Sequence, residues 1–427
     1  MTKRLAFLCP LFAALTLLAQ PPAPHVRVAQ GELVGDVTEM GPYVFKGIPY
    51  AAPPVGPLRW HEPQPPASWH GARDAAKFAP TCMQPIYAKT PPSAMSEDCL
   101  YLNVWTSDLH PANPAPVLVY IHGGSYMSGA GSRPSVDGTN LAVRGAVVVT
   151  INYRLGVLGF FAHPDLTAAS PHHSSGNYAL LDQLAALHWV RQNISAFGGD
   201  PRNITVFGES AGAGSIGYLI VSPLSQSLFD KAILESPTML FIATPELKRE
   251  YGGLSSQESI GLAVAPHISD LQNLPAADVI ARASEATEKF LGPGGGGHPR
   301  MRAATTLNDP TAVPLPWAPI VDGYVIPDQP AKLYAEGHYL HIPTMAGTNT
   351  DEGNLFLMHY HPESTASFST YVEHNFAPCV KQVLAQYGPA TVEQAHASAN
   401  RLLTDAIFLH PTVLFARDTV PYLGRVG

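Results

Sequence analysis

Short, continuous apolar runs alternate with stretches of helical periodicity along much of the chain. Residues 117–121 and 146–151 are two such runs, rich in valine and isoleucine. Continuous rather than alternating apolarity is typical of strands that are covered on both faces, as in a mostly parallel sheet. After the second run, leucines recur at helical spacing from Leu180, and Asn177 stands just before them as a candidate helix cap.

The alternation continues towards the end of the chain. Further strands are predicted at residues 204–207, 231–234 and 344–347, with a helix from Ala211 onward. The pattern predicts an α/β protein whose mostly parallel, doubly wound sheet has helices on both faces. We interpret the glycine-rich segment 292–297 as a surface loop, so that residues 20–427 form one domain.

Composition and charge exclude some classes of protein. Apolar residues make up 46% of the 427 residues and charged residues 14%, which is too apolar for a disordered chain. The formal net charge is −8, and the sequence contains no run of basic residues. We therefore expect no nucleic-acid partner.

The first residues have the pattern of an export signal. Lys3 and Arg4 precede an apolar run from Leu5 to Ala19. The run is shorter than the roughly 20 residues that a helix needs to cross a bilayer, and it suits a signal peptide at residues 1–19. We expect a secreted or periplasmic protein without stable membrane insertion after signal removal; an uncleaved N-terminal anchor is the alternative.

Three cysteines remain after the expected signal: Cys82, Cys99 and Cys379. Export permits a disulfide, and one between Cys82 and Cys99 would close a short loop, with a stabilisation of roughly 3 kcal/mol on the chain-entropy model. Cys379 would then remain as a buried thiol.

Metal ligation is not predicted. His172 and His173 are adjacent, and His359 and His361 are one residue apart, but no carboxylate or cysteine constellation accompanies either pair. The sequence also contains no C-x-x-C pair, which excludes a zinc ribbon or a dithiol redox motif.

The sequence Gly208-Glu209-Ser210-Ala211-Gly212 lies between a predicted strand and a predicted helix. In that context G-x-S-x-G forms a turn so tight that the serine side chain projects above the sheet, and the backbone N–H of the next residue faces a developing oxyanion. The pentapeptide therefore predicts Ser210 as a nucleophile and Ala211 as an oxyanion donor.

An overlapping pattern offers a different function. Gly212, Gly214 and Gly217 fit G-x-G-x-x-G, and Glu235 follows at about the distance expected of a dinucleotide site. However, the first of these glycines lies inside the predicted helix, where it could not cradle a pyrophosphate at the helix start. We therefore favour the nucleophile and expect no cofactor.

His122-Gly123-Gly124-Ser125 directly follows the predicted strand 117–121. Loops of this kind supply further N–H groups to an oxyanion hole. Glycine is needed where the backbone must approach the substrate closely. Ser125 stands where a third glycine is usual, so we expect a slightly different geometry there.

Several longer motifs resemble those of one family. They are Phe197 to Gly212 (FGGDPRNITVFGESAG), Glu97 to Val104 (EDCLYLNV), residues 47–51 (GIPYA), 53–56 (PPVG), 152–156 (NYRLG) and 347–353 (GTNTDEG). From about Val26 to Val420 the chain is similar to type-B carboxylesterases, the branch of the α/β-hydrolases that includes cholinesterases and para-nitrobenzyl esterases.

The resemblance implies roles for individual residues. It implies Ser210 as nucleophile and Glu352 as the acid of the triad, in the family's chain order of serine, acid and histidine. The residues that would surround the oxyanion are Gly123, Gly124, Ser125 and Ala211. Two structural ion pairs are also implied, Arg59 with Glu97 and Arg154 with Asp182.

The implied reaction is hydrolysis of a small-molecule carboxylic ester without a cofactor. In cholinesterases the loop between the two cysteines carries a tryptophan that binds the cation of choline; here that loop has Tyr87 as its only aromatic residue. We therefore expect uncharged esters as substrates. The alternative is a non-catalytic, cholinesterase-like binding protein or an inactive fragment.

The histidine of the triad is not found. In the family it stands in a G-x-x-H-x-x-[DE] context some tens of residues beyond the segment that resembles residues 402–408. None of the histidines after Glu352 has that context; they are His359, His361, His374, His396 and His410. We therefore expect a C-terminally truncated chain without its catalytic base and without the last strand and helix of the fold, ending within a strand at residues 421–426.

Overall fold

The structure is a computed structural model, which describes residues 23–85, 94–238, 244–252, 254–291, 317–357, 364–376 and 379–423. Its main feature is an eight-stranded sheet with the strand order β13-β12-β11-β9-β10-β8-β4-β3. The strands are β13 (Thr344–Gly347), β12 (Lys231–Glu235), β11 (Gly199–Glu209), β9 (Ala115–Ile121), β10 (Val147–Ile151), β8 (Tyr101–Thr106), β4 (Tyr43–Pro49) and β3 (Asp36–Val37).

The sheet is parallel from β13 to β10 and antiparallel from β10 to β3. Strands predicted at 117–121, 204–207, 231–234 and 344–347 all lie in the parallel part. The predicted α/β fold with a mostly parallel, doubly wound sheet is therefore confirmed.

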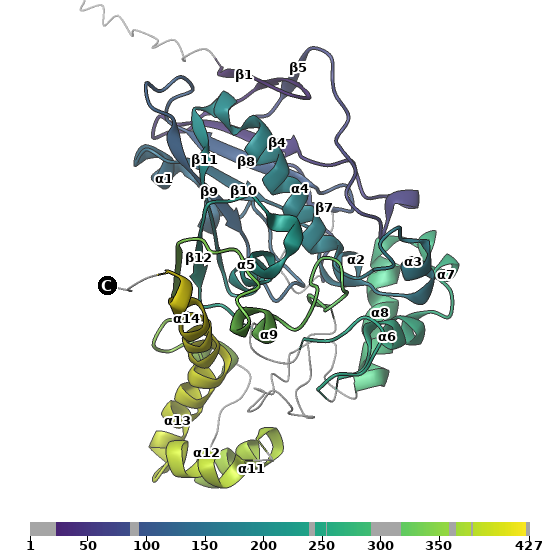
Figure 1. Cartoon of the computed structure of the whole chain (residues 1–427), viewed down its shortest axis with the longest axis vertical. Helices are drawn as coiled ribbons and strands as arrows, with labels where there is room; N and C mark the ends of the chain where they lie inside the picture. Colours follow the sequence, from purple (N-terminus) through teal and green to yellow (C-terminus); the bar gives the residue numbers. More distant parts are fainter. Residues whose placement is uncertain are drawn as a thin grey trace, which may run out of the picture.

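Helices cover both faces of this sheet (Figure 1). All five residues of β10 are buried, and its apolar residues divide between two clusters. Val147 and Val149 belong to the main core, whereas Val148 packs with Trp105 and Ala142 on the opposite face. The continuous apolarity of the run thus reflects burial on both sides.

The described helices are α1 (Thr139–Val143), α2 (Gly156–Phe160), α3 (Pro164–Ala169), α4 (Tyr178–Asn193), α5 (Ala211–Val221), α6 (Gln257–Val264), α7 (Ser269–Gln272), α8 (Ala276–Leu291), α9 (Pro330–Ala335), α10 (Asn354–Leu357), α11 (Thr365–Asn375), α12 (Val380–Tyr387), α13 (Val392–Thr404) and α14 (His410–Leu423). A π-helical turn, Asp405–Leu409, joins α13 to α14. Short 3₁₀ helices lie at Gly56–Leu58, Pro134–Val136, Ile194–Phe197 and Pro223–Ser225.

Asn177 precedes α4 but does not cap it with its side chain. Its amide instead donates to the carbonyl oxygen of Ile320 at 2.8 Å, and its carbonyl accepts from the N–H of Ile320 at 3.1 Å. The prediction that Asn177 caps the helix is therefore wrong, because its side chain is held by hydrogen bonds to the backbone of Ile320.

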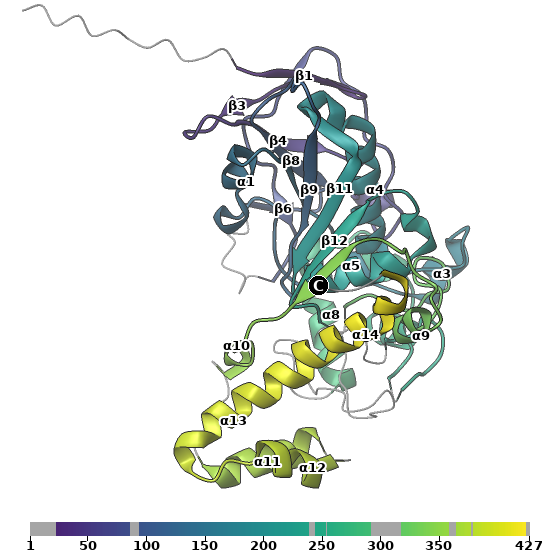
Figure 2. The same ribbon diagram turned by 60° about the vertical axis from the view of Figure 1, so that its left-hand side comes forward.

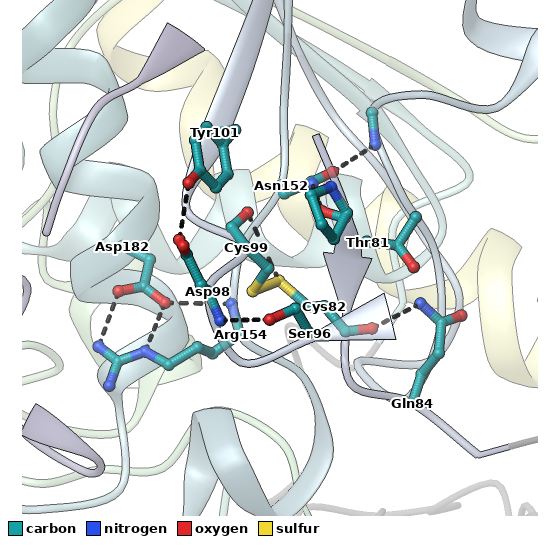
Figure 3. Close-up of a disulfide and its surroundings, with 12 residues drawn as sticks. Thr81, Cys82, Gln84, Ser96, Asp98, Cys99, Tyr101, Asn152, Arg154 and Asp182 are labelled. Atoms are coloured by element: carbon teal, nitrogen blue, oxygen red, sulfur yellow. Dashed lines mark hydrogen bonds and ion pairs between the residues drawn. A yellow bond between two sulfur atoms is a disulfide. The ribbon is translucent and has the colours of Figure 1, made fainter. Parts of the chain in front are cut away.

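Two small sheets lie beside the main one. The first has the order β1-β2-β5, with β1 (His25–Val28), β2 (Gly31–Val34) and β5 (Ala72–Asp74). The second pairs β6 (Thr81–Cys82) with β7 (Met95–Ser96). A disulfide joins Cys82 to Cys99 beside this pair (Figure 3). Cys379 is a free thiol and is half-buried rather than buried.

The end of the chain differs from the prediction. Pro421 to Leu423 form the last turn of α14, not the start of a strand, and residues 424–427 lie outside the described residues. Phe415 of α14 packs edge-on against Tyr334 at 5.3 Å, and the hydroxyl of Tyr339 donates to the carbonyl of Thr419. These contacts hold the segment as a helix against the region of α9.

Helices α11, α12 and α13 lie at the end of the molecule opposite β1 and β5 (Figures 1 and 2). They share a separate apolar cluster that includes Phe368, Leu402 and Phe408. The expected signal at 1–19 and the glycine-rich segment 292–297 lie outside the described residues. Within the described part, no helix has the length and apolarity that crossing a membrane requires.

Candidate active site

Ser210 lies in the turn between β11 and α5 and is half-buried. Its backbone has φ 56° and ψ −122°, a conformation that is unfavourable for a residue with a side chain. A Cβ on Gly208 would lie 2.6 Å from the carbonyl oxygen of Ile121, and one on Gly212 only 2.1 Å from it. Both glycines are therefore required for the turn to pack against the end of β9, and Ser210 has the geometry of a nucleophile elbow.

This geometry excludes a dinucleotide-binding site at the glycine pattern of residues 212–217. Gly212, Gly214 and Gly217 are all buried residues of α5. A phosphate cradle requires glycines in the loop that precedes a helix, with free N–H groups pointing at the ligand. Helical glycines serve close packing instead: a Cβ on Gly214 would lie 2.8 Å from the hydroxyl oxygen of Tyr126.

The glycine loop after β9 lies against the elbow. A Cβ on Gly123 would be 2.6 Å from the carbonyl oxygen of Glu209 and 3.2 Å from Cβ of Ser210. Gly124 has φ 112°, and Ser125 also has a positive φ, of 55°. The structure thus brings together Ser210, Ala211 and the loop Gly123-Gly124-Ser125, with Ser125 in a conformation that favours glycine.

His122 begins this loop and was not assigned a role from the sequence. Its ring is buried, stacks on Tyr153 at 4.2 Å, and donates from Nδ1 to the carbonyl oxygen of Gly123 at 2.9 Å. The hydroxyl of Tyr153 donates to the carbonyl oxygen of His122 at 2.5 Å. Burial lowers the pKa of His122 to about 4, so the ring is neutral near pH 7 and fixes the Gly123 peptide.

Glu352 follows β13, two strands away from Ser210 in the sheet. Its Oε1 accepts hydrogen bonds from the backbone N–H and the side-chain amide of Asn349, both at 3.0 Å. A third donor is the hydroxyl of Ser236, which the sequence reasoning missed. Ser236 directly follows β12, so a serine at the end of a parallel strand was the available signal.

The carboxyl ends of four adjacent parallel strands therefore carry the candidate site. β9 ends at the glycine loop, β11 at Ser210, β12 at Ser236 and β13 before Glu352. Register supports this alignment, since Glu235 pairs with Glu209 on one side and Gly347 on the other. Ligand sites of open α/β sheets lie at this edge.

The site is acidic. Burial and the charges of Glu352 and Glu235 raise the pKa of Glu209, and burial raises that of Glu235. Burial, together with the charges of Glu209 and Glu235, raises the pKa of Tyr120 to about 12. The carboxylates of these residues therefore lie close enough to act on one another.

A base for Ser210 is not seen in the described part of the chain, where no histidine forms a hydrogen bond or ion pair with Ser210 or Glu352. His396 and His410 are exposed residues of α13 and α14. His359, His361 and the side chain of His374 lie outside the described residues.

Two ion pairs support the scaffold. Arg59 contacts both carboxylate oxygens of Glu97, with nitrogen-to-oxygen distances of 2.6 and 2.7 Å. Arg154 contacts both oxygens of Asp182 at 2.7 and 2.8 Å, and both partners are buried (Figure 3). Desolvation alone lowers the pKa of Arg154, but the charge and hydrogen bonds of Asp182 hold it above its ordinary value. The pair ties the segment after β10 to α4.

In the described ranges, no group of three or more histidine, cysteine or acidic side chains is placed to hold a metal ion. His172 instead stacks on Tyr324 at 3.8 Å, with Nε2 3.6 Å from a carboxylate oxygen of Glu62. Tyr87, in the loop between the paired cysteines, lies outside the described residues.

Known proteins are similar to this chain in both sequence and fold. The chain is 40% identical over 366 residues to the fumonisin B1 esterase of Sphingopyxis macrogoltabida, a match that covers 85% of this chain and 63% of that protein. It is 37% identical over 405 residues to the para-nitrobenzyl esterase of Bacillus subtilis, covering 92% of this chain and 75% of the relative. The chain thus spans about two thirds to three quarters of these two relatives.

A solved carboxylesterase of Geobacillus stearothermophilus superposes with a TM-score of 0.75 at 32% identity, over 92% of this chain and 76% of that one. The family profile that matches is that of the carboxylesterase family, over residues 22–424. The match includes the glycine loop, Ser210 and Glu352. The chain belongs to the carboxylesterase family.

Proposed function

We propose that the protein is a serine carboxylic ester hydrolase that acts on uncharged esters through an acyl-enzyme at Ser210. The observation that carries the proposal is the approach of the glycine loop to the elbow, which leaves no room for a Cβ on Gly123 between Glu209 and Ser210. Such an approach places backbone N–H groups where an oxyanion develops above the serine. Family membership and the esterase relatives support the same reaction.

In the proposed reaction, Oγ of Ser210 attacks the ester carbonyl carbon and gives its proton to a base. The oxygen of the tetrahedral intermediate accepts hydrogen bonds from the N–H groups of Gly123, Gly124 and Ala211, with Ser125 adjoining. The C–O bond then breaks, the alcohol leaves with the proton, and water hydrolyses the acyl-enzyme by the same steps. Glu352 would orient the base.

We also propose that none of the histidines of this chain is that base. The support is the lack of a contact from any described histidine to Ser210 or Glu352. Loss of the histidine of a triad lowers kcat by about 10⁶-fold in the best-studied case. The chain should then hydrolyse esters slowly, through the remaining oxyanion donors.

The proposed substrates are small, uncharged esters. The loop between Cys82 and Cys99 contains no tryptophan, which removes the aromatic platform expected of a choline-ester enzyme. We propose a secreted or periplasmic location for the protein, on the support of the signal-like residues 1–19 and the disulfide.

The test is hydrolysis of p-nitrophenyl acetate with and without added imidazole. Imidazole can occupy the place of a missing histidine side chain, so we expect it to accelerate hydrolysis by the protein well beyond its effect in buffer. The acceleration should be lost in Ser210→Ala. Acetylthiocholine, a cationic ester, should be a poorer substrate under the same conditions.

Fast hydrolysis without imidazole that is lost in Ser210→Ala would show that the chain supplies its own base. An imidazole effect that is equal in the protein and in Ser210→Ala would contradict the acyl-enzyme proposal. That second outcome favours the alternative of a non-catalytic binding protein or an inactive fragment. The lack of a contact between Ser210 and any histidine that the structure describes also supports this alternative.

A further inference from the structure

The structure contains a cavity that Ser210 does not line. It has a volume of about 170 Å³ and is bounded by the loop after Trp60, by α3, by the start of α4 and by the segment before α9. Neither Ser210, Glu352 nor the glycine loop lines it. Since one water takes about 30 Å³ in the liquid, the space suits a small organic molecule rather than a single water.

The lining combines aromatic rings with negative charge. Tyr178 and Tyr324 contribute rings and hydroxyls, and Glu62 and Asp322 contribute carboxylates. None of the residues that line the cavity is lysine or arginine. Two arginines contact lining residues without lining the cavity themselves: Arg154 lies over the ring of Tyr178 and is paired with Asp182.

Arg59 is the other arginine, with its guanidinium over the ring of Trp60 at 5.6 Å. It is paired with Glu97, so its charge is also compensated. Among the residues that the structure describes, neither Glu62 nor Asp322 forms an ion pair with a lysine or arginine. A low-dielectric surface makes such a charge felt more strongly than it is in water.

Asp322 is held rigidly in the wall. Its Oδ2 accepts from the hydroxyl of Ser174 at 2.6 Å, and its Oδ1 accepts from the backbone N–H groups of Tyr324 at 3.2 Å and Ile326 at 2.9 Å. These neutral donors orient the carboxylate without cancelling its charge. Glu62, in contrast, is 37% exposed and lies 3.6 Å from Nε2 of His172.

Both carboxylates act on the same two hydroxyls. Burial is the main cause of the raised pKa of Tyr178 and of Tyr324, and the charges of Glu62 and Asp322 add to it in each case. The two acids and the two tyrosines therefore surround one space. His172, stacked on Tyr324, stands beside it.

We propose that this cavity is a second binding site, which takes a small organic cation with an ammonium group. The ammonium would donate to Glu62 and Asp322, and its alkyl part would contact the rings and the side chains of Leu166 and Leu181. An anion is excluded by the charge of the lining. A metal ion is disfavoured because no three ligating side chains converge in the described residues.

Calorimetric titration of the 427-residue protein with n-butylammonium tests this site, with 1-butanol as the neutral molecule of matching size. We expect saturable binding of one butylammonium per chain, and binding of butanol at least about tenfold weaker. Equal affinities for the two molecules would overturn the proposal, because the charge would then play no part.

Variants locate the site. Glu62→Gln and Tyr324→Leu should each weaken butylammonium binding about tenfold or more. Glu39→Gln should not, because Glu39 is exposed and does not line the cavity. Circular dichroism shows that each variant is folded. Glu209→Gln tests whether the cation binds at the acidic residues next to Ser210 instead. If butylammonium binding were lost in Glu209→Gln and unaltered in Glu62→Gln, the cation would bind at the active site and the proposal would be overturned.

Discussion

The hydroxyl of Ser236 donates a hydrogen bond to Oε1 of Glu352, and so joins the ends of two adjacent strands, β12 and β13. The backbone N–H of Ser236 also donates to the carbonyl oxygen of Gly347 at 2.7 Å. Ser236 is buried and has a positive φ of 51°. A residue held so firmly fixes the position of the Glu352 carboxylate.

Replacing Ser236 by alanine removes this hydrogen-bond donor but keeps a residue with a Cβ at the positive φ. Hydrogen bonds to a charged group contribute about 1.5–3 kcal/mol, so we expect the imidazole-assisted rate of p-nitrophenyl acetate hydrolysis to fall about tenfold or more. The change should appear in kcat and not in KM. Ser135→Ala, at an exposed serine, is the control; an unaltered rate in folded Ser236→Ala would refute a positioning role.

Gly123→Ala should damage the oxyanion hole without unfolding the protein. The new methyl group would meet the Glu209 carbonyl at 2.6 Å and Cβ of Ser210 at 3.2 Å, so the loop must move away. Loss of one oxyanion donor lowers kcat by about 10²-fold or more. The matched control is Gly347→Ala, where nothing lies within 4 Å of the added Cβ. Similar imidazole-assisted rates of hydrolysis in Gly123→Ala and Gly347→Ala would contradict the assignment of Gly123 to the oxyanion hole.

Asp182→Asn should strongly destabilise the fold. It leaves the charge of Arg154, whose side chain is 4% exposed, without its partner, and breaking a buried pair from one side costs about 3–5 kcal/mol. Urea unfolding measures the loss. Arg154→Met combined with Asp182→Leu should restore much of the stability, and Glu285→Gln, in an exposed pair with Lys289, should have little effect. A small decrease in the free energy of unfolding of Asp182→Asn would show that Arg154 forms other hydrogen bonds or ion pairs in the variant.

His122 should make the fold sensitive to acid. Burial lowers its pKa from 6.5 to about 4, so the unfolded chain binds this proton more readily than the folded one. Stability is therefore complete above about pH 6.5 and declines as the pH falls towards 4, by on the order of 3 kcal/mol from this group alone.

His122→Asn retains a donor for the Gly123 carbonyl but does not titrate. The free energy of unfolding should consequently fall less in this variant than in the original protein between pH 6.5 and 4, in urea titrations at each pH. His70→Asn, at an exposed histidine, is the control, and we expect its stability to vary with pH as that of the original protein does. Parallel curves for His122→Asn and the original protein would show that His122 is not the responsible group.

The sequence by itself was enough for the parallel part of the fold and for the elbow. The strand at 204–207 was visible because its burial favours an unbroken apolar run, whereas those at 231–234 and 344–347 are only partly buried and were visible from the alternation of strands and helices. Gly208 and Gly212 marked the turn, because only glycine fits against the carbonyl of Ile121. Such requirements are local, so they leave a trace in a short stretch of residues.

Only the tertiary structure revealed Ser236, the packing of His122 on Tyr153 and the cavity around Asp322. Each joins residues that lie far apart along the chain, as Ser236 and Glu352 do. The helical end of α14 was likewise decided by its contacts with Tyr334 and Tyr339, against the strand expected there. Pairing across strands and helices depends on which elements become neighbours, and the pattern of a single segment carries no information about its neighbour.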